Sequence, residues 1–259
     1  MRVGAWAVNL VLGVLLAGGV AWGAYRMRLL TRDGALGAVV VGASVFGLGG
    51  WQPSLLMVVF FFTSSLLPRV LGRSGQSERR NLWQVLANGG MPTLAVWLAF
   101  LAPAFAERAW LAYTASLACA TGDTWATEIG IRYGRQPRLI LTGAPVPPGT
   151  SGAVSLAGTL GALLGSGLIG GLGALGTGLS AAQFLWAWGA GLAGVMLDSL
   201  LGASVQARFV CQRCQKRTES RVHCGVPAEW HSGWRWLDNN GVNALATLGA
   251  ALTGFMGRF

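Results

Sequence analysis

The chain has 259 residues, of which 53% are hydrophobic and only 11% are charged, and its mean hydropathy is +0.52. An ordinary soluble domain carries about 25% charged residues, so this composition excludes one. The net charge of +10 requires no nucleic-acid partner, because membrane proteins place Lys and Arg in loops beside anionic lipid. We therefore expect an all-α, polytopic membrane protein with a single domain over residues 1–259.

Apolar segments separated by polar connectors follow one another along the chain. About 20 apolar residues span a hydrocarbon core of about 30 Å. Some segments are shorter, so we expect seven to nine transmembrane helices, and most simply eight. The first segment also fits a signal peptide ending near Ala21, which is the alternative interpretation. The Gly-rich stretch 158–178 predicts a helix packed closely against its neighbours. The segments are 3–24, 34–50, 53–68, 82–102, 109–128, 152–177, 181–206 and 239–257.

The basic residues mark one side of this predicted bundle. Sixteen of the nineteen Lys and Arg residues fall in connectors on one face, and only Arg2, Arg108 and Arg258 fall on the other. The positive-inside rule places the basic connectors, 207–237 among them, in the cytoplasm and both termini on the other side of the cell's inner membrane. The connectors contain Arg26, Arg28 and Arg32; Arg69, Arg73, Arg79 and Arg80; Arg132, Arg135 and Arg138; and Arg208, Arg213, Lys216, Arg217, Arg221 and Arg235.

Four carboxylates interrupt or border the apolar segments near that same side. Asp123 and Glu128 lie in the fifth segment, Asp198 lies in the seventh, and Asp238 precedes the eighth. An ionisable side chain within a bilayer is costly and therefore indicates a functional site. Mg²⁺ prefers a few carboxylates together with water and phosphate oxygens, so we predict Asp123, Asp198 and Asp238 as magnesium ligands. An N-cap role explains Asp238 equally well.

Helix geometry and neighbouring amides refine this prediction. Asp123 and Glu128 are about 140° apart around an ideal helix, so they share a ligand only if the helix breaks between them. Asn239 and Asn243 are one turn apart and share a face. The polar residues at this depth predict one binding site, and besides the carboxylates they are Asn88, Gly89, Gly90, Gln206, Asn239 and Asn243.

The loop before the sixth segment has the composition of a phosphate-binding turn. Thr150, Ser151 and Gly152 are followed by Ser155, and hydroxyls and backbone N–H groups at a helix N-terminus bind phosphate well. Arg138 upstream favours the same interpretation. The Walker spacing is absent from this sequence, so an ordinary P-loop ATPase is not supported. The alternative is a Pro-rich turn with a Ser or Thr cap.

The last basic connector, 207–237, is a Cys-rich loop. Three Cys plus one His match the ligands of a structural zinc site, and free thiols are the alternative. A cytoplasmic position disfavours disulfides, and no βαβ pattern supports a redox role. The predicted zinc ligands are Cys211, Cys214, Cys224 and either His223 or His231.

Five short motifs occur in a fixed order, at residues 86–90, 122–128, 147–152, 198–203 and 237–243. Together they resemble the integral-membrane family that includes plant and cyanobacterial phytyl-phosphate kinases and their uncharacterised animal and archaeal relatives. The resemblance extends from about Asp33 to the end. It implies phosphoryl transfer from a nucleoside triphosphate, with CTP favoured, to an isoprenyl monophosphate. Some family members lack the Cys-rich segment, which implies a structural role for it.

Combined with the residues, the resemblance implies a set of roles. Asp123 and Asp198 act in catalysis by holding Mg²⁺, with Asp238 as a third ligand. Thr150, Ser151, Gly152 and Ser155 bind phosphate with help from Arg138. Asn88, Asn239 and Asn243 supply orienting hydrogen bonds, and Gly89, Gly90, Glu128 and Gln206 complete the predicted site. Two alternatives stay open, a cytidylyltransferase that releases pyrophosphate and a transporter without nucleotide chemistry. The oligomeric state is not determined by the sequence.

Overall fold

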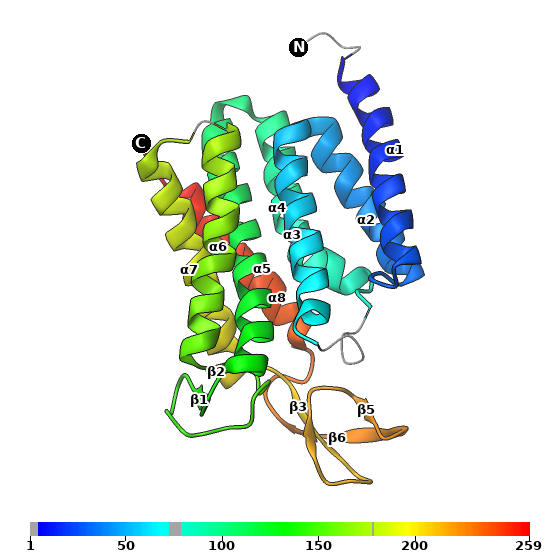
Figure 1. Ribbon diagram of the computed structural model, residues 1–259, viewed down its shortest axis with the longest axis vertical. Coiled ribbons are helices and arrows are strands. Elements are labelled where there is room, and N and C mark those ends of the chain that lie inside the picture. The colour runs from blue at the N-terminus through cyan, green and yellow to red at the C-terminus, as the bar shows by residue number, and fades with distance from the viewer. Residues whose placement is uncertain (1–4, 73–78, 178) are drawn as a thin grey trace.

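Long helices account for most of the chain, as the apolar segments predict. The computed structural model describes residues 5–72, 79–177 and 179–259, so Arg2 and Arg73 lie outside the described residues (Figure 1). A π-helical turn, Val45–Gly49, continues α2, and a 3₁₀ turn, Pro103–Phe105, precedes α5. The helices are α1 (Ala5–Arg26), α2 (Arg32–Ser44), α3 (Trp51–Val70), α4 (Leu82–Leu101), α5 (Ala106–Tyr133), α6 (Leu156–Thr177), α7 (Ala181–Ser204) and α8 (Asn239–Phe255).

These eight helices coincide with the eight predicted segments and confirm the all-α membrane fold. Within the described residues, six helices are long and apolar enough to cross a membrane, namely α1, α2 with its π turn, α3, α4, α6 and α7. Helices α5 and α8 do not meet these criteria of length and apolar character, each for its own reason. Helix α8 has only 17 residues. Helix α5 has 28 but is less apolar, because it carries Asp123 and Glu128 as well as charged ends.

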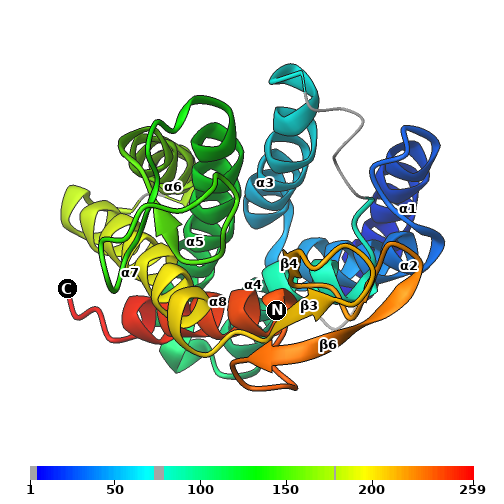
Figure 2. The ribbon, with the colours of Figure 1, turned by 90° about the horizontal axis from the view of Figure 1, so that it is seen from below.

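Successive helices run in alternating directions. The start of α1 and the end of α8 lie at one end of the bundle, and the strands lie at the other (Figure 1). The ends of α1, α3, α5 and α7 therefore all lie toward the end that carries the strands, which we call the strand end (Figure 2). The described basic connectors thus gather at one end of the molecule. That this end faces the cytoplasm stays a prediction.

Helix α5 forms the centre of the bundle and packs against α3, α4, α6, α7 and α8. Its contact with α6 depends on glycine. A Cβ atom at Gly161 would lie 2.7 Å from the Trp125 carbonyl oxygen, and one at Gly165 would lie 3.0 Å from that of Thr121. Such close approach supplies van der Waals contact, which drives helix association in lipid. The close packing predicted from the Gly-rich stretch is confirmed.

The structure settles one conditional expectation, on helix α5, and corrects one boundary, the start of the sixth helix. Helix α5 continues unbroken to Tyr133, so Asp123 and Glu128 lie on different faces of one helix. The sixth helix begins at Leu156 rather than at 152, because Gly149 and Gly152 take positive φ angles of +83° and +76° and turn the chain. The turn allows β2 (Ala153–Val154) to pair antiparallel with β1 (Arg138–Leu139) before the helix starts.

The Cys-rich connector is a small antiparallel sheet rather than an irregular loop. Its strand order is β4-β3-β6-β5, and Phe209 pairs with Trp230 at its centre. Three of the strands have only two to four residues, which is too short for an alternating pattern to predict them. The strands are β3 (Arg208–Cys211), β4 (Arg217–Thr218), β5 (Val222–His223) and β6 (Val226–Ser232).

Candidate functional site

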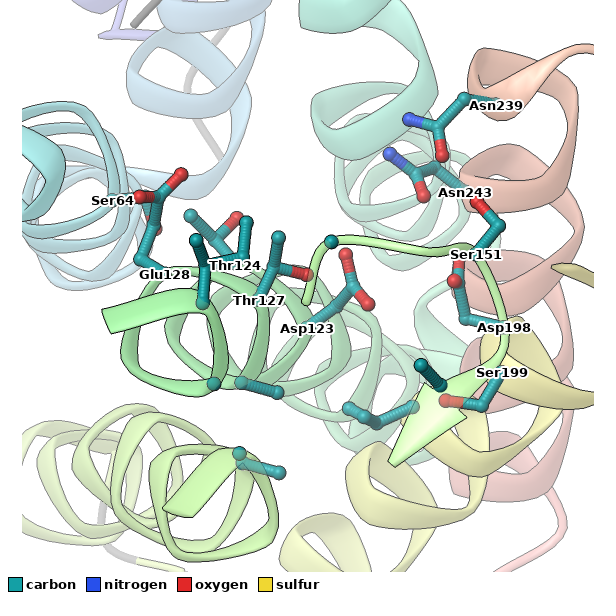
Figure 3. A pocket seen from close by; sticks show the side chains of 18 of the residues that line it. Ser64, Asp123, Thr124, Thr127, Glu128, Ser151, Asp198, Ser199, Asn239 and Asn243 are labelled. Carbon is teal, nitrogen blue, oxygen red and sulfur yellow. The ribbon is translucent and has the colours of Figure 1, made fainter. Parts of the chain in front are cut away.

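A polar cavity of about 910 Å³ opens among the ends of α3 to α8 at the strand end. Side chains from α3, α5, α7 and α8 surround one space within it (Figure 3). The sequence predicts polar groups from the fourth, fifth, seventh and eighth helices at one depth, and all four helices line this cavity. Helix α3 is an addition that was not predicted from the sequence. The predicted site residues that line the cavity are Asn88, Asp123, Glu128, Thr150, Ser151, Gly152, Ser155, Asp198, Asp238, Asn239 and Asn243.

Carboxylates give the cavity its chemistry. The Asp198 carboxylate lies within electrostatic range of Asp123 and Glu219, and these like charges repel one another. Among the described residues, none donates a hydrogen bond to the buried Oδ2 atom of Asp198. A buried charged oxygen without a partner is costly, so this site favours a bound cation. The cavity-lining carboxylates are Asp123, Glu128, Asp198, Glu219 and Asp238.

Within the described residues, the carboxylates alone do not form a closed metal cage. In the described part of the chain, the carboxylates form no group of three whose oxygens all lie within 4.8 Å of one another. Mg²⁺ commonly takes one or two carboxylates and completes its shell with water and substrate phosphates. Asp238 caps α8, since its Oδ1 atom accepts a hydrogen bond from the Gly241 N–H at 3.0 Å. The other carboxylate oxygen of Asp238 can bind a ligand at the same time, because a carboxylate accepts at both oxygens.

Arg80 supplies a buried positive charge to this cavity. Its guanidinium stacks over the Phe60 ring at 5.5 Å, and the Glu128 and Asp123 carboxylates attract it. Burial lowers the pKa of Arg80 to about 10, so the side chain remains a cation at neutral pH. Hydrogen bonds hold the Arg80 backbone at both its N–H group and its carbonyl group. The Arg80 N–H donates to the Leu29 carbonyl at 2.9 Å, and the Arg80 carbonyl accepts from the Thr31 N–H at 3.1 Å.

The loop over residues 147–155 is held against the end of α7. A Cβ atom at Gly152 would lie 2.4 Å from that of Ala203, so this contact requires glycine. The Ser155 Oγ atom accepts a hydrogen bond from the Gly158 N–H at 3.1 Å and caps α6. The first turn of α6 therefore points its positive dipole end at the cavity, as a phosphate site requires.

Gln206 supports this loop without lining the cavity. Its buried amide nitrogen donates to the Ser151 Oγ atom at 3.1 Å and to the Glu219 carboxylate at 2.8 Å. On the opposite wall, the Thr247 hydroxyl donates to the Ala87 carbonyl at 3.1 Å, which ties α8 to α4 beside Asn88. Hydrogen bonds between elements thus fix the walls of the cavity.

Three predicted residues lie elsewhere. The Arg138 guanidinium donates to the Gly143 carbonyl at 2.8 Å and turns back onto its own loop. Gly89 packs against Val41 of α2, where an added Cβ atom would lie 3.3 Å from a Val41 methyl group, and Gly90 lines neither described cavity. The helix boundaries expected from the sequence do not show where Arg138, Gly89 and Gly90 point. Their directions depend on the conformation of the loop after α5 and on the rotation of α4 about its axis.

Several cavity residues were not predicted from the sequence as site residues, and four of them bear on the chemistry of the cavity. Ser64 and Ser65 of α3 are buried, and among the described residues their hydroxyls have no hydrogen-bond partner. Arg80 and Glu219 are the other two of these four. The two adjacent serines, Ser64 and Ser65, could have been recognised in the sequence as candidate site residues, because they are polar residues inside an apolar segment. Arg80 and Glu219 lie in charged connectors, where nothing in the sequence distinguishes them from neighbouring charges.

The Cys-rich sheet contains a separate cluster of metal-ligand side chains. One ligand atom from each of Cys211, Cys214, His223 and Cys224 lies within 4.8 Å of all the others. In a tetrahedral zinc site with Zn–S bonds of about 2.3 Å, neighbouring sulfurs are about 3.8 Å apart, so these four could hold a metal ion. His231 lies on β6 outside the cluster, which leaves His223 as the nitrogen ligand.

Hydrogen bonding within this cluster favours a thiolate at Cys211 and a thiol at Cys224. The Cys214 backbone N–H lowers the pKa of Cys211 to about 6. Interaction with the Cys214 side chain raises the pKa of Cys224 to about 11, so several thiolates do not coexist without a cation. Strand β4 leads from the cluster to Glu219 and Ser220 at the cavity, so the sheet connects the two sites.

Comparison with known proteins shows what the chain is similar to. A family described as "Integral membrane protein DUF92" matches residues 15–251. "Protein PGR" of Arabidopsis thaliana is 31% identical over 96% of this chain and 94% of its own length. An uncharacterized membrane protein of Methanocaldococcus jannaschii is 34% identical over 78% of this chain and 86% of its own length. "Protein VTE6, chloroplastic" of Arabidopsis thaliana is 24% identical, over 89% and 66%. No solved structure matches.

Proposed function

The chain belongs to the DUF92 family of integral membrane proteins, and from this premise we propose that it phosphorylates an isoprenyl monophosphate. The phosphoryl donor is a nucleoside triphosphate, with CTP favoured, and the product is the isoprenyl diphosphate. One observation carries the proposal: a single cavity brings carboxylates, a buried cation and a capped helix N-terminus together at one end of a membrane bundle. The motif resemblance to phytyl-phosphate kinases supports the same substrate class.

The chemistry needs two phosphate groups in line. An oxygen of the acceptor monophosphate attacks the γ-phosphorus of the nucleotide and forms a new P–O bond. The bond between that phosphorus and the β–γ bridging oxygen breaks, and the nucleoside diphosphate leaves with the electron pair. The acceptor oxygen is already ionised, so the reaction requires no strong general base. Catalysis then depends on positioning and on charge neutralisation.

The cavity residues divide these tasks. Asp123 and Asp198 would hold Mg²⁺ together with the nucleotide phosphates, which suits the unpaired Asp198 oxygen. When bound, the ion neutralises charge that develops on the transferred group. The first turn of α6 and the hydroxyls of Thr150 and Ser151 bind phosphate oxygens. The acceptor lies across the cavity, toward the buried positive charge of Arg80.

Two alternative activities share parts of this site. A cytidylyltransferase would use the same carboxylates but would direct attack to the α-phosphorus. A transporter needs access from both sides of the membrane, and the polar cavity described here lies at one end of the bundle. The one-sided cavity favours an enzyme over a transporter, and the Lys and Arg bias predicts that the enzyme works at the cytoplasmic surface of the inner membrane.

Product analysis tests the proposal. Purified protein in lipid nanodiscs is incubated with an isoprenyl monophosphate, Mg²⁺ and CTP, UTP, ATP or GTP labelled on either the α- or the γ-phosphate. The kinase proposal expects γ-label in an isoprenyl diphosphate. Lipid that gains α-label while pyrophosphate is released would instead establish cytidylyl transfer. Absence of label in lipid with every nucleotide would reject both enzymatic functions.

A further inference from the structure

A second cavity lies beside the polar one, between α1, α2, α3 and α4. It has a volume of about 320 Å³, and apolar side chains form nearly all of its wall. Several of them are exposed at the surface of the bundle, among them Leu16 and Val20 of α1 and Leu55 of α3. We call this cavity the apolar groove. These exposed residues lie on helices that can span a membrane, where a membrane protein meets the acyl chains of the bilayer.

The apolar groove meets the polar cavity at three residues. Arg80, Gln84 and Asn88 line both cavities, and the last two are one turn apart on the same face of α4. Phe60, which lines the groove, is the ring over which the Arg80 guanidinium stacks. The cation therefore lies at the boundary between an apolar space and a polar one.

Helix α3 changes character at this same boundary. Met57 and Phe60 line the apolar groove, and Ser64, one turn after Phe60, lines the polar cavity. The hydroxyls of Ser64 and Ser65 are buried and, among the described residues, have no hydrogen-bond partner. Helix α3 thus presents apolar groups to the groove first and hydroxyl groups to the polar cavity next, toward the strand end.

We propose that the apolar groove binds the hydrocarbon tail of the isoprenyl monophosphate, and that Arg80 binds its phosphate with help from Ser64 and Ser65. The identity of this lipid rests on the proposed function. A hydrocarbon chain that ends in a phosphate has the chemistry of the two joined spaces, because its apolar part avoids water while its charged end needs donors. This position turns the acceptor phosphate toward Asp123 and Asp198, where the nucleotide is bound.

Photolabelling without nucleotide tests where the tail lies. The probe is an isoprenyl monophosphate with a diazirine on its tail, added to the full-length protein in nanodiscs. Labelled peptides are expected from residues 13–21 and 51–61. Label confined to α6, α7 or α8 would overturn the proposed tail position. Phosphatidic acid should compete poorly, because the groove is proposed for one chain, and equal competition would contradict that occupant.

Matched substitutions on α1 sharpen this test. Val20 is 37% exposed and lines the groove, whereas Val14 is 47% exposed and does not. Val20→Trp should fill the groove and raise KM for a long-chain acceptor roughly tenfold, with little change for a short-chain acceptor or in kcat. Val14→Trp should match the wild type. Equal KM values for Val20→Trp and Val14→Trp would contradict binding of the hydrocarbon tail in the apolar groove.

Arg80 requires a comparison of two lipids. Arg80→Gln should weaken binding of the isoprenyl monophosphate by roughly tenfold or more but leave the corresponding alcohol unaffected, since only the phosphate meets the charge. Arg80→Lys should retain part of the affinity. Equal loss for phosphate and alcohol would show a structural role only. If the probe labels the apolar groove but the protein transfers no phosphoryl group, the proposed kinase function is rejected and the proposed tail site is retained.

Discussion

The Gln206 side-chain amide, just beyond the end of α7, donates a hydrogen bond to the Ser151 hydroxyl oxygen at 3.1 Å. The same nitrogen donates to Glu219 at 2.8 Å. One buried side chain therefore joins the loop before α6 to the connector that carries the Cys cluster. Both partners line the polar cavity, so the position of its walls depends on this residue.

Replacing Gln206 with Leu should loosen both walls. Loss of a buried hydrogen-bond partner costs about 1–3 kcal/mol, which should lower the thermal midpoint and raise KM for the nucleotide more than KM for the lipid. Gln212→Leu is the control, because Gln212 is exposed on the same connector. Differential scanning fluorimetry and initial rates measure the two effects. A normal nucleotide KM in Gln206→Leu would show that the loop does not bind phosphate.

The cavity carboxylates should be indispensable but not needed for folding. Asp123→Asn and Asp198→Asn preserve shape and remove charge, so each should insert normally and lose about a thousandfold in kcat. Because both carboxylates are proposed to act through one ion, the double variant should be little worse than either single one. Glu229→Gln, on an exposed part of β6 away from the cavity, should retain full activity.

A double variant whose loss equals the product of the two single losses would argue against a shared ion. Substantial activity in either single variant would remove that residue from the catalytic assignment. Size-exclusion profiles of all variants show whether any loss reflects misfolding.

The Cys cluster should hold one structural zinc ion. Protein purified without chelators is expected to contain about one zinc per chain, and Cys211→Ser should lose the metal and melt at a lower temperature. Cys119→Ala is the matched control, since Cys119 is buried in the bundle outside the cluster. Elemental analysis and thermal melting measure both properties. Wild-type protein that binds no zinc would leave three free thiols in the cluster.

Membrane orientation is tested with thiol reagents that do not cross the membrane. The strand end is predicted to face the cytoplasm, so the wild-type thiols should not react in intact cells. Thr218→Cys should gain label only after permeabilisation. Ala104→Cys, exposed at the opposite end of the bundle, should react in intact cells. Labelling in the reverse order would invert the topology.

The features that the sequence determined are those that depend on neighbouring residues along the chain. Apolar length predicts each helix, and the spacing of Lys and Arg predicts that the basic connectors share an end. The carboxylates Asp123 and Asp198 were evident because a charge is costly within an apolar segment. Close packing at Gly161 and Gly165 followed from the density of small residues alone.

The composition of the site was decided by contacts between distant parts of the chain. Arg80 becomes a cavity residue because Leu29 and Thr31 hold its backbone, and Glu219 becomes one because Gln206 holds its side chain. Arg138 has the right charge but turns to its own loop. These outcomes depend on helix rotation and on hydrogen bonds between separate elements, and residue spacing along the chain contains neither quantity.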